Sequence, residues 1–174
     1  MNDLLNWQPP QIPTRQKRAQ SDYLRHIMGG ADGDCPTCGR YGKVYKRQIN
    51  TAMILMLRNL YRTAAAAALP YPDAYFHISD FLGVRGIGSG DLGKLAYWQL
   101  IESKIDPDDD SKRCSGWWRI TRKGRQFIDN SLVVPKYSYV FDGEVIKQSE
   151  NQLVSVVDCI GKKFDYSELM NATV

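Results

Sequence analysis

The sequence predicts an α+β fold with a helix-turn-helix at its centre, and three observations within residues 76–128 support this prediction. Leu92, Leu95, Trp98 (or Gln99) and Ile101 recur at steps of three and four, which gives one apolar stripe on a helix. The glycine-rich segment GVRGIGSG lies just before this stripe and predicts a turn. The segment GWWRIT alternates its side chains between two faces, as a β-strand does.

The flanking segments supply the remaining elements in chain order. A long helix is expected from Tyr45 to Leu69, because a run of alanines propagates helix and Pro70 with Pro72 stops it. Five further elements should follow in the chain. They are a short strand (75–78), a short helix capped by Ser79, a second helix (89–103), an acidic hairpin loop with its strand, and a closing helix from Thr121. Strand, helix, turn, helix, hairpin and helix is the order of a winged helix.

A sequence pattern adds a resemblance to this element order. LAYWQLIE followed by WWRITRKGRQFI resembles the recognition helix, wing and closing helix of winged-helix transcription regulators. In those proteins a strand often ends in aromatic-x-Leu/Ile-Thr-x-Lys-Gly-Arg, and residues 118–125 fit that pattern. Gln99 stands where that family usually has glycine. The resemblance covers residues 76–128 and implies a DNA-binding domain. More loosely, CPTCGRYGKVYKRQIN joined to such a domain resembles small uncharacterised proteins encoded by bacteriophages.

We therefore predict three regions: an N-terminal extension with a CxxC knuckle (1–44), the winged-helix domain (45–132) and a C-terminal β-hairpin appendage (133–174). Residues 1 to about 20 are expected to be an extended arm or disordered, and Ser21–Met28 a turn of helix. In the appendage, Asp142-Gly143 predicts a tight hairpin turn, because both positions favour positive φ. LVSVVDCIG is expected to be a third strand, and FDYSELM a short helix capped by Asp165.

Composition excludes several classes of protein. The chain has 174 residues, is 43% hydrophobic and has a formal net charge of +4. No apolar run reaches the ~18 residues of a membrane span, and the first residues lack the layout of a signal peptide. We expect a cytoplasmic protein, in the host cell cytoplasm if it is phage-encoded, with no membrane partner. The segment 15–47 has eight basic residues and three acids, which permits contact with nucleic acid.

Cys35 and Cys38 form the sharpest local motif, Cys-Pro-Thr-Cys-Gly. Two thiolates at this spacing can bind one metal ion, and the glycine allows the tight turn of a zinc knuckle. A structural zinc needs two more ligands, for which the chain offers Cys114, Cys159, His26 and His77, or the same pair from a second copy in a homodimer. A redox pair and a metal-free turn are the alternatives.

Two groups of residues are candidates for binding nucleic acid. The first is a basic cluster interleaved with Tyr41 and Tyr45, and its members are Arg40, Lys43, Lys46 and Arg47. The alternative for this cluster is a solvated surface beside the long helix. The second is the DNA-contacting surface that a winged helix would present: Arg85, Ser89, Lys94, Tyr97, Lys112 and Arg113. The four aspartates of the acidic loop oppose phosphate binding there.

No residues suggest catalysis, since the two histidines are far apart in sequence and no nucleophile motif accompanies them. GVRGIGSG lacks the Lys-Ser/Thr pair of a phosphate-binding loop. We therefore expect a DNA-binding protein, such as a regulator of transcription or replication, and not an enzyme. The alternative is a protein-interaction module that binds and modulates a host protein, which the acidic loop and the aromatic residues Trp117, Tyr137 and Tyr139 favour.

Overall fold

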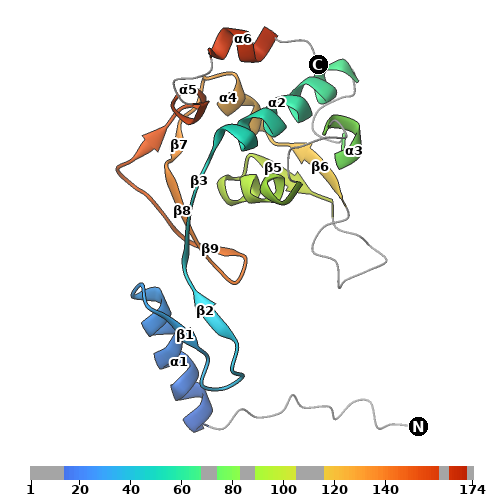
Figure 1. The fold of residues 1–174 in the computed structure, drawn as a ribbon. Coiled ribbons are helices and arrows are strands. Elements are labelled where there is room, and N and C mark those ends of the chain that lie inside the picture. Colours follow the sequence, from blue (N-terminus) through green and yellow to red (C-terminus); the bar gives the residue numbers. More distant parts are fainter. Residues whose placement is uncertain (1–13, 68–73, 83–88, 105–115, 161–164, 172–174) are drawn as a thin grey trace, which may run out of the picture. The chain divides into compact units, whose positions relative to one another are not determined.

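The structure, a computed structural model, describes residues 14–67, 74–82, 89–104, 116–160 and 165–171 (Figure 1). These residues form helices and short antiparallel strands, so the α+β prediction is confirmed. The chain divides into two compact units. Unit 1 comprises residues 1–45 and 140–143, and unit 2 comprises residues 46–139 and 144–174.

Unit 1 is a helix packed on a β-hairpin. Its elements are α1 (Thr14–Met28), β1 (Asp32–Asp34) and β2 (Tyr41–Lys43). β1 and β2 are antiparallel, with Gly33 opposite Gly42. The Tyr23 hydroxyl from α1 donates to the Gly33 carbonyl at 3.1 Å, and a Cβ on Gly42 would overlap that hydroxyl. Glycine at position 42 therefore lets the helix approach the hairpin.

The extended arm predicted for residues 1–20 is wrong from Thr14 onward, because α1 begins there. Residues 14–20 contain Arg, Gln, Lys and Ala, which are all good helix formers. The residue-type preference therefore outweighs the weak apolar periodicity of this segment. Residues 1–13 lie outside the described residues.

The longest helix of unit 2 is shorter than predicted. α2 spans Thr51–Ala66, and the preceding Tyr45–Gln48 form strand β3. Asn50 starts the helix, since its side-chain oxygen accepts a hydrogen bond from the Met53 N–H at 2.9 Å. The expected helix start at Tyr45 is therefore wrong.

The central elements follow α2 in the expected order. They are β4 (Phe76–His77), α3 (Ile78–Phe81), η2 (Ser89–Trp98), β5 (Ile101–Ser103), β6 (Trp117–Ile120) and α4 (Arg122–Ile128). β6 lies between β4 and β5 in one antiparallel sheet. The cap of α3 is His77 and not the predicted Ser79, since the His77 Nδ1 accepts from the Ser79 N–H at 3.4 Å and the His77 N–H donates to the Asp80 carboxylate at 2.9 Å. The closing helix was predicted to open at Thr121, and Thr121 is the N-cap of α4.

The second helix was predicted as α-helix from Ser89 to Ser103, and both its type and its end are wrong. η2 is a 3-10 helix that ends at Trp98, and the last three residues of the predicted helix form β5. The three-residue spacing of Leu92, Leu95 and Trp98 places all three on one face at 3.0 residues per turn. Gln99 then adopts φ of 60°, which ends the helix.

The C-terminal elements are β7 (Val134–Pro135), β8 (Tyr137–Phe141), β9 (Glu144–Gln148), β10 (Leu153–Val154), α5 (Val156–Ile160) and α6 (Tyr166–Asn171). Asp142 and Gly143 both have positive φ, 48° and 84°, as the predicted turn requires. The predicted strand LVSVVDCIG is wrong beyond Val154. Ser155 and Asp158 exchange hydrogen bonds between side chain and backbone, and these bonds cap α5.

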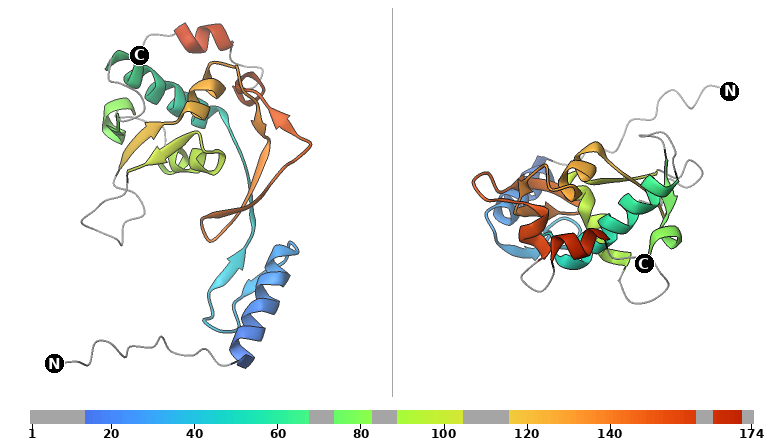
Figure 2. Two further views of the ribbon diagram at one scale, coloured as in Figure 1. Left: turned by 180° about the vertical axis from the view of Figure 1, so that it is seen from behind. Right: turned by 90° about the horizontal axis from the view of Figure 1, so that it is seen from above.

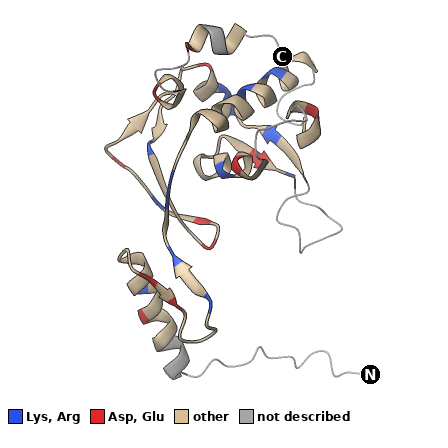
Figure 3. Ribbon diagram, in the orientation of Figure 1, with Lys and Arg blue, Asp and Glu red and all other residues tan. Residues whose placement is uncertain are grey.

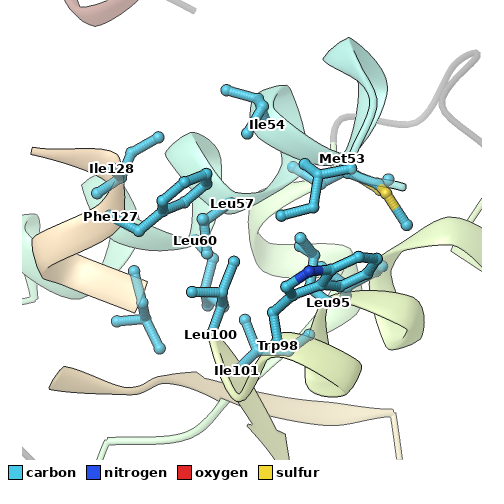
Figure 4. Close-up of a cluster of buried hydrophobic side chains, with 14 of the residues drawn as sticks. Met53, Ile54, Leu57, Leu60, Leu95, Trp98, Leu100, Ile101, Phe127 and Ile128 are labelled. Carbon is cyan, nitrogen blue, oxygen red and sulfur yellow. The ribbon is translucent and has the colours of Figure 1, made fainter. Parts of the chain in front are cut away.

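One hydrophobic core holds unit 2 together. α2 packs against η2, β6 and α4 (Figures 1 and 2). Figure 4 shows Trp98 beside Met53 and Leu95, with Leu57 and Phe127 in the same cluster. The Trp98 indole N–H donates to the Pro135 carbonyl at 2.6 Å, so the C-terminal segment is joined to η2.

Candidate metal knuckle and nucleic-acid interface

The CxxC motif forms the loop between β1 and β2. Its ends are joined by the Cys35 N–H, which donates to the Arg40 carbonyl at 2.9 Å, and by the Gly39 N–H, which donates to the Cys35 carbonyl at 2.8 Å. Gly39 has φ of 69°, a conformation that favours glycine. Cys35 is buried and Cys38 is exposed. The loop thus has the tight turn expected of a metal knuckle.

The backbone of this loop is directed at the Cys35 sulfur. Hydrogen bonds from the N–H groups of Thr37 and Cys38 lower the pKa of the Cys35 thiol, and the Cys38 side chain contributes in the same direction. Amides that stabilise a thiolate suit a sulfur that binds a metal. The two cysteines of the predicted knuckle therefore lie close together in unit 1.

The described residues do not supply the other two ligands. No group of three or more His, Cys, Asp and Glu side chains gathers around a common point in the part of the chain that the structure describes. His77 is engaged in capping α3, Cys159 lies in α5, and Cys114 lies outside the described residues.

Unit 1 has little hydrophobic core of its own. Its buried apolar side chains, among the described residues, are Ile27, Cys35 and Val140. Leu24 and Met28 of α1 and Tyr41 of β2 are exposed. Units of this size usually need a metal ion, disulfides or a partner to be stable. The small core thus leaves unit 1 with few buried apolar side chains to stabilise it.

The predicted basic cluster lies along β2 and β3 and the loop before them (Figure 3). Arg40 is exposed, whereas Lys43 pairs with Asp32 across the hairpin at 3.0 Å. The hydrogen bond from Lys43 to Asp32 raises the pKa of the lysine. Lys46 and Arg47 belong to β3 in unit 2, where the Lys46 ammonium lies 3.7 Å from the centre of the Tyr137 ring. These four residues are therefore close together along the chain but belong to two units, Arg40 and Lys43 to unit 1 and Lys46 and Arg47 to unit 2.

The side-chain charges of η2 cancel, because its charged residues are one acid, Asp91, and one base, Lys94. Leu92, Leu95 and Trp98 are buried, and Lys94 forms an ion pair with Asp91. Tyr97 is half-buried, and its carbonyl accepts a hydrogen bond from the Gln148 side chain at 2.9 Å. Ser89 is the first residue of η2, and its side chain is not described. Of the predicted DNA-contacting residues, η2 therefore brings Lys94 and Tyr97 together.

Arg85, Lys112 and Arg113, with the acidic loop, lie outside the described residues. The strands on either side of that loop, β5 and β6, pair as a hairpin should, with Glu102 opposite Arg119. The Arg119 guanidinium donates to the Glu102 carboxylate at 2.8 Å. The charges of Glu102 and Arg119 therefore neutralise each other in the part of the hairpin that the structure describes.

Sequence reasoning did not predict one further surface. A pocket of about 390 Å³ lies in unit 2 beside β8, and it brings together residues distant in sequence: Lys46, Tyr137, Tyr139, Lys147, Ser149, Glu150, Asn151 and Gln152. We call it the β8 pocket. Tyr137 and Tyr139 lie two residues apart on one strand, and this alternation is visible in the sequence. The lysines could not be assigned to it, because Lys46 was expected in a helix.

Comparisons with known proteins identify no relative. No family model matches this chain, and no curated protein or solved structure matches it either. Among the described residues, no helix is both long enough and apolar enough to cross a lipid bilayer.

Proposed function

We propose that this protein binds DNA through a winged-helix domain in unit 2, with α3 and η2 as its helix-turn-helix. The supporting observation is the sheet order β4-β6-β5, combined with the chain order α2, β4, α3, η2, β5, β6, α4. A winged helix has this order, and it places the second helix of the pair on the DNA. Lys94, Tyr97 and Gln99 are the polar side chains that η2 and its C-terminal turn would bring to the duplex.

The Asp91–Lys94 pair provides a sharp test of this proposal. Fluorescence anisotropy with a mixed-sequence duplex at low salt should show binding at micromolar protein. Lys94→Glu should weaken it, and Asp91→Asn should strengthen it, because the released lysine can contact a phosphate. Arg122→Glu, an exposed position on α4, is the charge-matched control. Absence of duplex binding, or equal effects of Lys94→Glu and Arg122→Glu, would contradict the proposal.

A protein-interaction module is the second candidate, and the charges of η2 and the β5–β6 hairpin favour it. Lys94 and Arg119 both have acidic partners. In addition, every residue of β9 from Glu144 to Lys147 is exposed, including Val145 and Ile146. β9 is also an outer strand in the order β3-β8-β9, so it is open to pairing with a strand of another protein. A partner retained in pull-downs after nuclease treatment and at high salt would favour this candidate.

We further propose that Cys35 and Cys38 bind zinc and that the ion stabilises unit 1. The knuckle turn and the small core of that unit support this proposal. Purified protein should contain zinc in a fixed ratio to chain, and Cys35→Ser should remove it. A ratio of one half would indicate sharing between two chains, and a ratio of one would indicate ligands from a single chain. Cys159→Ser is the matched control and should leave the zinc content unchanged. Protein without zinc that is as stable as zinc-loaded protein would contradict the proposal.

A further inference from the structure

The β8 pocket combines aromatic rings with positive charge. Tyr137 and Tyr139 are half-buried on β8, and Lys46 and Lys147 line the pocket with them. In the part of the chain that the structure describes, neither lysine forms an ion pair with an acid. These two lysines are thus available to bind phosphate.

The two tyrosines have different surroundings. The Tyr137 ring has the Lys46 ammonium 3.7 Å from its centre and the Lys136 ammonium at 5.3 Å, so it holds two cations in place. Among the described residues, Tyr139 has no such cation and no stacked ring against it. Tyr139 is therefore the ring on which a flat ligand can stack.

The rest of the pocket is polar and of suitable size. A volume of about 390 Å³ is at the small end of ligand pockets and suits a unit of about one nucleotide. Asn151 and Gln152 are exposed and carry amide donors and acceptors for the edge of a base. Hydrogen bonds hold this loop, since the Lys136 N–H donates to the Gln152 carbonyl at 2.8 Å and Ser149 Oγ donates to the same carbonyl at 2.9 Å. Among the described residues that line the pocket, Glu150 is the one acid.

We propose that the β8 pocket binds single-stranded nucleic acid, with one base stacked on Tyr139 and the neighbouring phosphates on Lys46 and Lys147. A ring flanked by lysines is suited to unpaired bases, because the base faces of a duplex are already stacked on one another. This inference rests on the proposed nucleic-acid function, but it uses residues apart from η2. Tyr137 is a positioning residue that holds Lys46.

The test measures binding of fluorescent oligo-dT, oligo-U and a duplex to the full chain. Tyr139→Ala should weaken single-strand binding by at least about fivefold, since one base–aromatic stack is lost. Tyr139→Phe should retain it. Lys147→Gln should reduce the slope of log affinity against log salt by about 0.7, whereas Arg122→Gln should leave the slope unchanged. Glu150→Gln should strengthen binding.

The outcomes separate this inference from the DNA-binding proposal. Loss of single-strand binding in Tyr139→Ala with unchanged duplex binding would support the β8 pocket, and the two oligonucleotides would show whether DNA or RNA is preferred. Duplex binding that depends on Lys94, together with single-strand binding unaffected by Tyr139→Ala, would overturn the inference and leave the first proposal standing. Equal loss in Tyr139→Ala and Tyr139→Phe would also overturn it. Circular dichroism of each variant shows whether the fold is retained.

Discussion

Gly124 in α4 lies directly against the backbone carbonyl of Leu100, so that a methyl group at position 124 would overlap the carbonyl oxygen. The same methyl would lie 2.9 Å from Cγ1 of Ile120. Leu100 also accepts a hydrogen bond from the Thr121 N–H at 3.0 Å. The start of α4 therefore packs directly against the segment that joins η2 to β5. Glycine at position 124 allows this close approach, because it has no Cβ.

Gly124→Ala should destabilise unit 2 by about 1–3 kcal/mol, because neither backbone can move without disturbing the core. Thermal unfolding followed by circular dichroism measures this change. Gly90→Ala is the matched control, since a Cβ at Gly90 meets no atom within 4 Å. A Gly124→Ala variant as stable as Gly90→Ala would show that α4 does not pack on Leu100 in solution.

Thr121 contributes to the same junction through its hydroxyl. That group donates to the Gln99 carbonyl at 2.6 Å and accepts from the Gly124 N–H at 3.0 Å. Thr121→Val keeps the shape and removes both bonds, so it should lower the free energy of unfolding by about 1–2 kcal/mol. Thr121→Ser retains the hydroxyl and should cost less. Chemical denaturation with urea compares the two variants, and equal losses would contradict the role of the hydroxyl.

Gln99 has a left-handed backbone, with φ of 60°. This conformation costs a side-chain-bearing residue about 1–2 kcal/mol, and glycine adopts it without that cost. Gln99→Gly removes this cost, but glycine also has a greater conformational entropy in the unfolded chain, which opposes the gain. The net effect should be a rise in the free energy of unfolding of up to about 1 kcal/mol. Ala96→Gly, an exposed position in η2, should instead lower it. A lower melting temperature for Gln99→Gly would contradict this account.

The junction around Thr121 shows what the sequence could predict. The Thr-Arg-Lys-Gly-Arg pattern indicated the start of α4, and the departure at Gln99 marked the position that proved to be left-handed. These features depend on residues close together in the chain. The same holds for the Asp142–Gly143 turn and for the cap of α6, where Asp165 accepts from the Ser167 N–H at 2.7 Å.

The errors concern segments whose structure depends on distant partners. Lys46 lies in a strand because β3 joins β8, about 90 residues later in the chain, and no local pattern in Tyr-Lys-Arg-Gln indicated that pairing. Ile101 continued the apolar spacing of η2, yet it pairs with Ile120 in the sheet. The β8 pocket was missed for the same reason, because its lysines come from β3 and β9.

The cysteines should differ strongly in reactivity, and this difference tests the knuckle geometry. Burial, with a smaller contribution from the Asp158 charge, raises the pKa of Cys159 to about 12, whereas the amides of Thr37 and Cys38 lower the pKa of Cys35. At pH 8, with metal removed by a chelator, iodoacetamide should alkylate Cys35 before Cys159, because only the thiolate reacts, and Cys38 is exposed to the reagent. Peptide mapping by mass spectrometry assigns each site.

The raised pKa of Cys159 also predicts how the free energy of unfolding changes with pH. Between its unfolded pKa of about 8.5 and its folded pKa of about 12, the unfolded chain loses the proton while the folded chain keeps it. The free energy of unfolding should therefore be unaffected by this thiol below about pH 8.5 and should fall as the pH rises above that value. Cys159→Ala should remove part of this fall, measured as the melting temperature between pH 8 and pH 11. Rapid alkylation of Cys159 in the native protein at pH 8 would contradict its raised pKa, and zinc that slows alkylation of Cys35 and Cys38 would support the knuckle.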